Sequence, residues 1–249
     1  MTPDVVADVG NSRIKWGLCR QNRVEEFVAL PLDDDDLWAA QLREWELSAQ
    51  ARWAACGVSP RSLERLLKWL EGRCGGVTLL SSFRQLPITV SVDVPERVGM
   101  DRLLNAVAAS QHARPGVSSF LVDAGSAVTV DWLDAAGAFR GGAIFPGLRL
   151  MARALHEYTA LLPVVEFTGL SGPGMPGKNT QAAIEAGIFL AAAGGIRALL
   201  GELAASESNY QVFLTGGDSR HFEAVLEPGF IAWPEMTLEG IRISAERLP

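Results

Sequence analysis

Near the start of the chain stands Val5-Val6-Ala7-Asp8-Val9-Gly10-Asn11-Ser12. Its pattern is repeated near the middle by Phe120-Leu121-Val122-Asp123-Ala124-Gly125-Ser126-Ala127. In each copy an apolar run ends in an aspartate, and a glycine with small polar neighbours follows two residues later. Both copies then return to apolar, β-favouring sequence, at residues 14–18 and 128–133. We expect each copy to form a β-hairpin whose tight turn exposes backbone N–H groups beside a fixed carboxylate.

Such a turn suits a phosphate group and its counter-ion. Backbone N–H groups and small hydroxyls bind phosphate oxygens, and a neighbouring carboxylate can hold a cation. Taken alone, Asp8 is explained more simply as a side chain that caps a turn. The second copy favours the functional interpretation, because two turn caps need not share an apolar run and a glycine at the same offsets. Two such turns facing each other across a cleft would bind a polyphosphate from both sides.

Within this hypothesis each residue of the two turns has an expected role. The donors to phosphate oxygens in the first turn would be Gly10, Asn11 and Ser12. Asp8 would orient Mg²⁺ through water, because Mg²⁺ keeps much of its hydration shell. Lys15 would either add a positive charge or point outward from its strand, and the pattern does not choose between them. In the second turn Ser126 is the candidate donor and Asp123 the anionic partner.

Composition excludes several classes of function. The 249 residues are long enough for two compact lobes, and 48% of them are hydrophobic, which is typical of a well-packed enzyme. The net charge is −7 and the pI is near 5.1, so a basic nucleic-acid-binding surface is not expected. The three histidines are far apart and lack metal-ligand spacing, which argues against a transition-metal site.

The same composition points to the cytoplasm. Three cysteines without CxxC spacing indicate reduced thiols rather than disulfides. The N-terminus lacks the basic and long apolar regions of a signal peptide. The longest apolar run, residues 186–196, is shorter than the roughly 18–20 residues of a membrane span. We therefore expect a cytoplasmic protein that binds neither membrane nor nucleic acid.

Strand and helix patterns alternate along the chain, which predicts an α/β protein built from two related halves. Beyond the two hairpins, strands are expected at residues 24–30, 51–58, 77–80, 88–92, 141–145 and 211–214. Helices are expected at residues 37–50, from 59 onward, at 103–109, 148–155 and 180–205, the last after a Gly/Pro-rich loop at 169–178. A hinge within residues 111–119 would separate lobes at 1–114 and 115–249.

Glycines inside the expected helix at 180–205 have a structural cost. Gly187, Gly194 and Gly195 each destabilise a helix by roughly 1 kcal/mol relative to alanine. We expect close backbone packing against these positions to compensate.

Asp101 is a second candidate for chemistry. It follows Gly99-Met100 and directly precedes a helical run, so an ordinary N-cap is one interpretation. The other is a general base for an acceptor hydroxyl, because a helix N-terminus favours the ionised carboxylate. Arg102 would either extend into solvent or bind a substrate carboxylate through its guanidinium fork.

Seven segments, in order along the chain, resemble the type III pantothenate kinase family, within the acetate and sugar kinase/Hsc70/actin superfamily. They are residues 8–12, 99–102, 123–131, 141–147, 154–163, 177–180 and 215–218. The resemblance implies two duplicated ribonuclease H-like (actin-like ATPase) lobes with an interlobe nucleotide cleft. It also implies ATP-dependent phosphorylation of pantothenate, the first step of coenzyme A biosynthesis, by a homodimer.

The family's site residues carry over to positions in this chain. The ATP phosphate loop would be Asp8, Val9, Gly10, Asn11, Ser12, Arg13, Ile14 and Lys15, with Ser126 contacting ATP from the other lobe. Asp101 would be the proton acceptor, and the pantothenate site would comprise Gly99, Met100, Asp101, Arg102 and Thr180. Asp123 would hold the K⁺ or NH₄⁺ that such enzymes require, and Mg²⁺ would accompany ATP near Asp8. The turn at 216–217 would lie near the nucleoside.

Some residues depart from the family pattern. Ser12 and Ser126 stand where threonine is common, and each keeps the hydroxyl. Met100 replaces a small residue, and no tyrosine precedes Gly99 where many members have one. A kinase of the same fold acting on another hydroxylated metabolite is therefore one alternative. A nucleotide-binding regulator without turnover is another, although such a protein would not need to keep Asp101.

Overall fold

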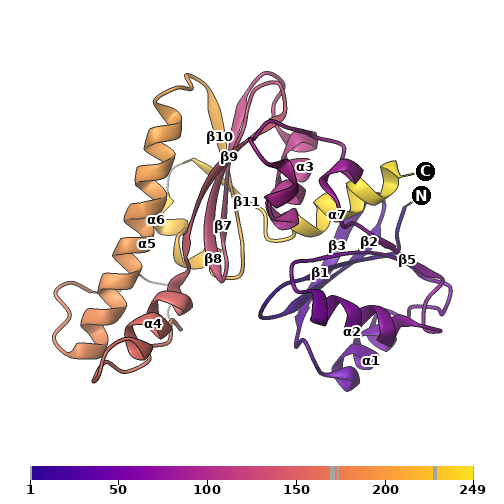
Figure 1. Ribbon diagram of the computed structural model, residues 1–249, viewed down its shortest axis with the longest axis horizontal. Helices are drawn as coiled ribbons and strands as arrows, with labels where there is room; N and C mark the ends of the chain where they lie inside the picture. The colour runs from indigo at the N-terminus through magenta and orange to yellow at the C-terminus, as the bar shows by residue number, and fades with distance from the viewer. Residues whose placement is uncertain (1, 169–171, 173, 227–228, 249) are drawn as a thin grey trace. The chain divides into compact units, whose positions relative to one another are not determined.

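The computed structural model describes residues 2–168, 172, 174–226 and 229–248. By their contacts the residues group into two units (Figure 1). Unit 1 comprises residues 1–112, 137–139 and 235–249, and unit 2 comprises 113–136 and 140–234. The C-terminal residues thus group with unit 1, whereas the sequence expectation counted them in the second lobe. The lobe boundaries at 1–114 and 115–249 stay a prediction.

Unit 1 is built on a five-stranded sheet of order β3-β2-β1-β4-β5. Its strands are β1 (Val5–Val9), β2 (Ile14–Arg20), β3 (Arg23–Leu30), β4 (Arg52–Gly57) and β5 (Gly76–Leu79). The first three strands are antiparallel neighbours, while β4 runs parallel to both β1 and β5. The first repeated motif therefore forms a hairpin, as predicted.

Four helices belong to unit 1. They are α1 (Asp35–Glu44), α2 (Pro60–Leu70), α3 (Met100–His112) and α7 (Met236–Arg247). Short elements fill the chain between β5 and α3: η1 (Phe83–Gln85), β6 (Thr89–Val90) and η2 (Pro95–Arg97). The helix expected at 37–50 is shorter than predicted, because α1 ends at Glu44 and Glu46 adopts a positive φ of 51°.

Four tryptophans pack against one another in the core on one face of this sheet. Trp16 packs edge-on against Trp53 at 4.9 Å between ring centroids, and Trp38 packs edge-on against Trp69 at 5.3 Å. Trp38 comes from α1 and Trp69 from α2, so these two helices cover the face that also carries the alternate apolar residues of β1 and β2. Trp69 is 8% exposed and packs in this core.

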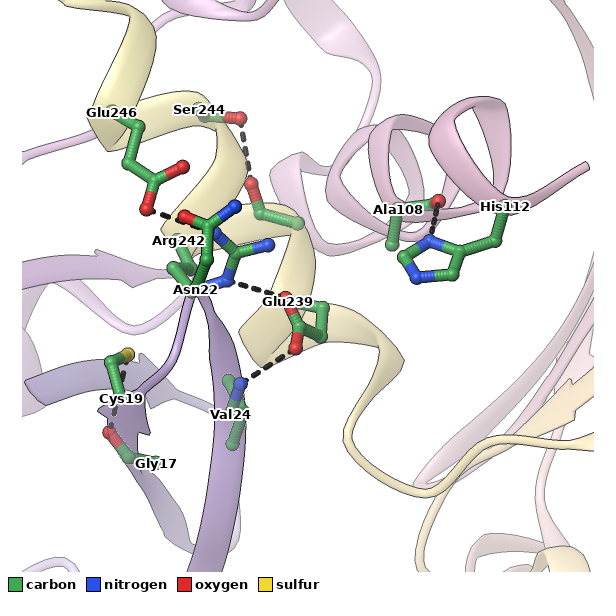
Figure 2. Close-up of polar contacts among 11 residues, drawn as sticks. Gly17, Cys19, Asn22, Val24, Ala108, His112, Glu239, Arg242, Ser244 and Glu246 are labelled. Carbon is green, nitrogen blue, oxygen red and sulfur yellow. Dashed lines mark hydrogen bonds and ion pairs between the residues drawn. The ribbon is translucent and has the colours of Figure 1, made fainter. Parts of the chain in front are cut away.

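Helix α7 packs on β1, β2 and β4 and lies beside α3, and the sequence reasoning did not foresee it. Figure 2 shows the polar contacts that fix it. Glu239 accepts a 2.6 Å hydrogen bond from the backbone N–H of Val24 and pairs with Arg242 at 2.6 Å. Arg242 also pairs with Glu246 at 2.9 Å and donates to Asn22 at 3.1 Å. These buried charges tie the last helix to the β2–β3 hairpin.

Unit 2 repeats the strand order of unit 1. Its strands are β7 (Ser118–Ala124), β8 (Ala127–Leu133), β9 (Ala138–Pro146), β10 (Tyr210–Thr215) and β11 (Phe230–Ala232). They lie in the order β9-β8-β7-β10-β11, and β6 pairs with residues 138–139 of β9, which group with unit 1. Strands β7 and β8 form the second antiparallel hairpin, and β10 runs parallel to β7 as β4 does to β1. The internal duplication is therefore present in the strand topology itself.

Two longer helices, α4 (Leu148–Glu157) and α5 (Thr180–Ala204), complete unit 2 with η3 (Ser219–His221) and α6 (Glu223–Leu226). Part of the loop expected at 169–178 lies outside the described residues. Within the described chain one helix, α5, is long and apolar enough by length and composition to cross a membrane. Ile184, Ile188 and Ile196 of α5 pack in the core of unit 2, as in the core helix of a globular domain.

The prediction of close backbone packing at the three glycines of α5 is wrong. A Cβ added to Gly187 or Gly194 would meet no described atom within 4 Å, whereas one on Gly195 would meet the side chain of Phe145 at 3.5 Å. Close backbone packing therefore does not compensate for these glycines in this structure.

Candidate active site

The first repeated motif ends in a four-residue turn. Val9 and Ile14 are register partners, and the backbone N–H of Gly10 donates to the carbonyl of Arg13 at 3.1 Å to close the loop. Asn11, Ser12 and Arg13 are exposed. The turn therefore offers polar groups to a ligand while β1 and β2 stay buried beneath it.

Asp8 lies in a row of side chains that crosses three strands. Its register partner on β2 is Lys15, and its partner on β4 is Cys56. Register partners share a face of a sheet, and this face is the one opposite the tryptophan core. Lys15 is therefore beside Asp8, on the face where α3 and α7 pack on the sheet.

Asp101 occupies the first turn of α3. Its Oδ1 accepts a 2.9 Å hydrogen bond from the backbone N–H of Arg102, and a Cβ on Gly99 would come within 2.5 Å of the same oxygen. The glycine therefore makes room for the carboxylate. The guanidinium of Arg102 lies over the ring of Phe139, 5.6 Å from its centroid.

Asp8 is the strand-register partner of Cys56, and the charges of both Asp8 and Asp101 act on this thiol. Cys56 is 1% exposed, and burial first, then the charges of Asp8 and Asp101, raise its pKa to about 12. Both carboxylates act on the same sulfur although they are distant in sequence. Sequence reasoning identified the two acids but missed Cys56, because a lone cysteine in a buried strand carries no functional pattern.

In unit 2 the second repeated turn is closed by a 3.0 Å hydrogen bond from the Gly125 N–H to the Ala127 carbonyl. Two other turns press against it. A Cβ on Gly147 would overlap the Gly125 carbonyl, and one on Gly216 would overlap the backbone of Ala124. The Gly147 N–H also donates to the Ser126 carbonyl at 3.0 Å. Ser126 is exposed at the meeting point of the three turns.

Gly216 has a φ of +102°, a left-handed conformation that favours glycine. Its turn continues to Asp218, whose N–H donates to the Ala124 carbonyl at 2.8 Å and whose carboxylate pairs with Arg149 at 3.2 Å. Sequence reasoning missed Arg149, which stands in the first turn of α4 and keeps most of its side chain exposed.

Thr180 begins α5, where Asn179 caps the helix by accepting from the Ala182 N–H at 2.8 Å. Thr180 also lines an apolar groove of about 730 Å³ between α4 and α5. The site residues of the sequence analysis are thus divided. Those at 8–15 and 99–102 belong to unit 1, and Asp123, Ser126 and Thr180 belong to unit 2.

Comparison with known proteins gives the family. The family model described as type III pantothenate kinase matches residues 5–202. This chain belongs to that family. A family relative named type III pantothenate kinase from Bacteroides fragilis is 36% identical and covers 96% of this chain and 95% of its own length. One from Alkalilimnicola ehrlichii is 32% identical and covers 95% of each chain.

The fold of this family member is that of the actin-like ATPases. The activator of 2-hydroxyisocaproyl-CoA dehydratase from Clostridium difficile superimposes with a TM-score of 0.56 at 11% identity, covering 98% of this chain and 94% of the other. A putative 2-dehydro-3-deoxygalactonokinase from Sinorhizobium meliloti gives 0.54 at 15% identity, covering 97% and 98%. The fold expectation is confirmed, with β1–β2 and β7–β8 as its duplicated hairpins.

Proposed function

We propose that this chain transfers the γ-phosphoryl group of ATP to the primary hydroxyl of pantothenate, the first step of coenzyme A biosynthesis. Membership of the type III pantothenate kinase family carries the proposal. The charges of Asp8 and Asp101, which both act on the buried Cys56 thiol, support it, because phosphoryl transfer needs a phosphate site and an acceptor site in the same region.

The turn at residues 10–13 binds the phosphates in this proposal. The backbone N–H groups of the exposed residues Asn11 and Ser12, and the Ser12 hydroxyl, donate to phosphate oxygens, whereas the Gly10 N–H closes the turn. Lys15, beside Asp8, adds a positive charge. We assign Ser126 to the same nucleotide as a donor, and the turn at 216–217 to the nucleoside.

The oxygen of the acceptor hydroxyl forms a bond to the γ-phosphorus of ATP while the bond between that phosphorus and the ADP oxygen breaks. Asp101 accepts the proton that the hydroxyl loses. The hydrogen bond from the Arg102 N–H holds one carboxylate oxygen in place, which leaves the other for the hydroxyl. We assign Met100 and Arg102 of this helix, and Thr180 of α5, to the acceptor site.

The residues fit the cations that the family implies. Within the described residues no group of three or more His, Cys, Asp and Glu side chains forms a metal cluster, so a divalent ion would depend on few carboxylates. That is the usual coordination of Mg²⁺ with a nucleotide, and Asp8 is the carboxylate we assign to it. Bound Mg²⁺ would neutralise phosphate charge. Asp123 is our candidate for K⁺ or NH₄⁺.

We propose a homodimer formed through the groove between α4 and α5. Its lining is almost wholly apolar, and Tyr158 and Leu161 beside it are 85% and 91% exposed. Exposed apolar patches of this kind mark interaction sites, and a second copy of the chain is the partner we assign. A Cβ added to Gly187, which lines this groove, would meet no atom of the described residues within 4 Å.

A coupled ADP-release assay on the purified full chain tests the reaction. It contains MgATP, pantothenate and either KCl or choline chloride at equal ionic strength, with mass spectrometry of the product. ADP release that requires pantothenate and yields a singly phosphorylated product supports the proposal. Release with another hydroxylated metabolite but not pantothenate would select the same-fold alternative that Met100 suggested. ATP binding without turnover on any acceptor would select the regulator.

A further inference from the structure

Strand register places two hydroxyls on either side of Asp123. Thr129 of β8 and Thr215 of β10 are both register partners of Asp123 on β7. Register partners share a face of the sheet and have Cβ atoms about 5 Å apart. Asp123 therefore lies between the two threonines on one face of the sheet. The opposite face of the same strands carries Val122 and Val130 of the unit 2 core.

The Thr129 hydroxyl is buried without a partner. The side chain is 9% exposed, and none of the residues that the structure describes offers Oγ1 a hydrogen bond. The Thr215 hydroxyl differs, because it donates to the Pro234 carbonyl at 3.3 Å. A buried hydroxyl that stays unpaired destabilises the folded state, so an unpaired one beside a carboxylate points to a missing ligand.

We propose that Thr129 is an oxygen ligand of the monovalent cation at Asp123. The proposal rests on the cation site of the proposed function and adds a residue to it. Cations such as K⁺ replace hydration water with neutral oxygen atoms, and a hydroxyl has two acceptor lone pairs for this purpose. One carboxylate with two hydroxyls also balances a single positive charge.

The sequence alone does not indicate that Thr129 lies beside Asp123. Thr129 lies six residues beyond Asp123 and belongs to the apolar strand after the turn. Only the tight turn at 125–126 folds β8 back so that Thr129 becomes the register partner of Asp123.

Thermal unfolding of the full chain tests the proposal independently of turnover. The melting temperature is measured in KCl and in choline chloride at equal ionic strength, with and without MgADP. The variants are Thr129→Val, which has the same shape without the hydroxyl, Thr129→Ser, which keeps it, and Thr78→Val on the exposed side of β5 as a remote control.

We expect KCl to raise the melting temperature of the wild type, Thr129→Ser and Thr78→Val. For Thr129→Val, the K⁺ concentration that gives half of the maximal rise in melting temperature should be at least tenfold higher than for the wild type. Its melting temperature in choline chloride should equal or exceed that of the wild type, because an unpaired hydroxyl has been removed. The K⁺ concentration for half-maximal turnover should shift in parallel.

Two results would overturn the inference. One is a Thr129→Val protein whose response to KCl equals that of the wild type, as when the hydroxyl binds only water. The other is a wild type whose melting temperature is the same in both salts, with and without MgADP. Neither result contradicts pantothenate phosphorylation. A wild type whose melting temperature responds to KCl but which releases no ADP with pantothenate would contradict the proposed function and not the Thr129 inference.

Discussion

Gly240 of α7 lies directly against the backbone carbonyl of Leu104 in α3, and a Cβ on this glycine would overlap that oxygen. Next to this contact the Thr237 hydroxyl donates a 2.8 Å hydrogen bond to Asn105 Oδ1, with both side chains buried. The two helices are therefore held at a fixed separation. Because Asp101 stands one turn before Asn105, these α3–α7 contacts help to fix the position of the candidate base.

Gly240→Ala should force α3 and α7 apart. Overpacking of this kind costs about 1–3 kcal/mol of stability, and the displacement of α3 should lower kcat more than it changes the KM for ATP. Chemical denaturation and steady-state kinetics measure the two effects. The matched control is Gly201→Ala in α5, where an added Cβ would meet no atom of the described residues within 4 Å. This substitution should stabilise the helix by roughly 0.5–1 kcal/mol. Equal effects of the two substitutions would contradict the positioning role.

Asp101→Asn should remove the proton acceptor while keeping the shape of the side chain. The asparagine carbonyl still accepts from the Arg102 N–H, so α3 should remain intact. We expect kcat to fall by about 10²–10⁴, the usual contribution of a general base, with little change in ATP affinity. Kinetics and nucleotide titration check this. Undiminished turnover, or loss of ATP binding, would remove Asp101 from this role.

The repeated hairpins were predictable from sequence because their signal is local. An apolar run, an aspartate and a glycine at a fixed offset determine a strand and its turn. Helix α7 was not predictable in the same way. Its buried residues include Glu239 and Arg242, which read as surface residues until the β2–β3 hairpin supplies their partners.

In the candidate site, too, the residues with a local sequence pattern were predictable and those that depend on tertiary contacts were not. Asp8 and Asp101 were chosen for their local patterns, and in the fold the charges of both act on the buried thiol of Cys56. Thr129 has no such pattern, because its place beside Asp123 depends on strand register. Sequence therefore indicated the residues that carry charge and missed the residues that pack or coordinate beside them.

The raised pKa of Cys56 predicts a loss of stability at high pH. In the folded chain the thiol stays protonated up to about pH 12, whereas the unfolded thiol ionises near its usual 9.0. Between these values the folded state binds the extra proton, so stability falls as pH rises, by at most about 1.36 kcal/mol per pH unit. Unfolding at pH 8 to 10.5 should show a shallower decline in Cys56→Ala. Cys74→Ala, at a partly exposed thiol, serves as the control, and identical slopes in both variants would contradict the burial effect.

Arg242→Met should leave Glu239 and Glu246 without the cation that both now contact (Figure 2). Removing one partner of a buried ion pair costs about 3–5 kcal/mol, because the remaining charge is uncompensated. Denaturant unfolding measures the loss. Arg65→Met removes an exposed pair with Asp35 and should cost at most about 1 kcal/mol. If the two substitutions cost the same, the buried cluster is not what fixes α7.

Leu161→Asp should disperse the proposed homodimer. Leu161 is 91% exposed and lies in the segment that follows α4, so a charge there leaves the core of unit 2 unchanged but opposes burial against a second copy. Light scattering should give twice the 26.7 kDa chain mass for the wild type and the single mass for the variant at the same concentration. Leu37→Asp, at an exposed leucine of α1 in unit 1, should remain dimeric. A wild type that is monomeric at every concentration, or a Leu161→Asp protein that stays dimeric, would exclude the α4–α5 groove as the interface.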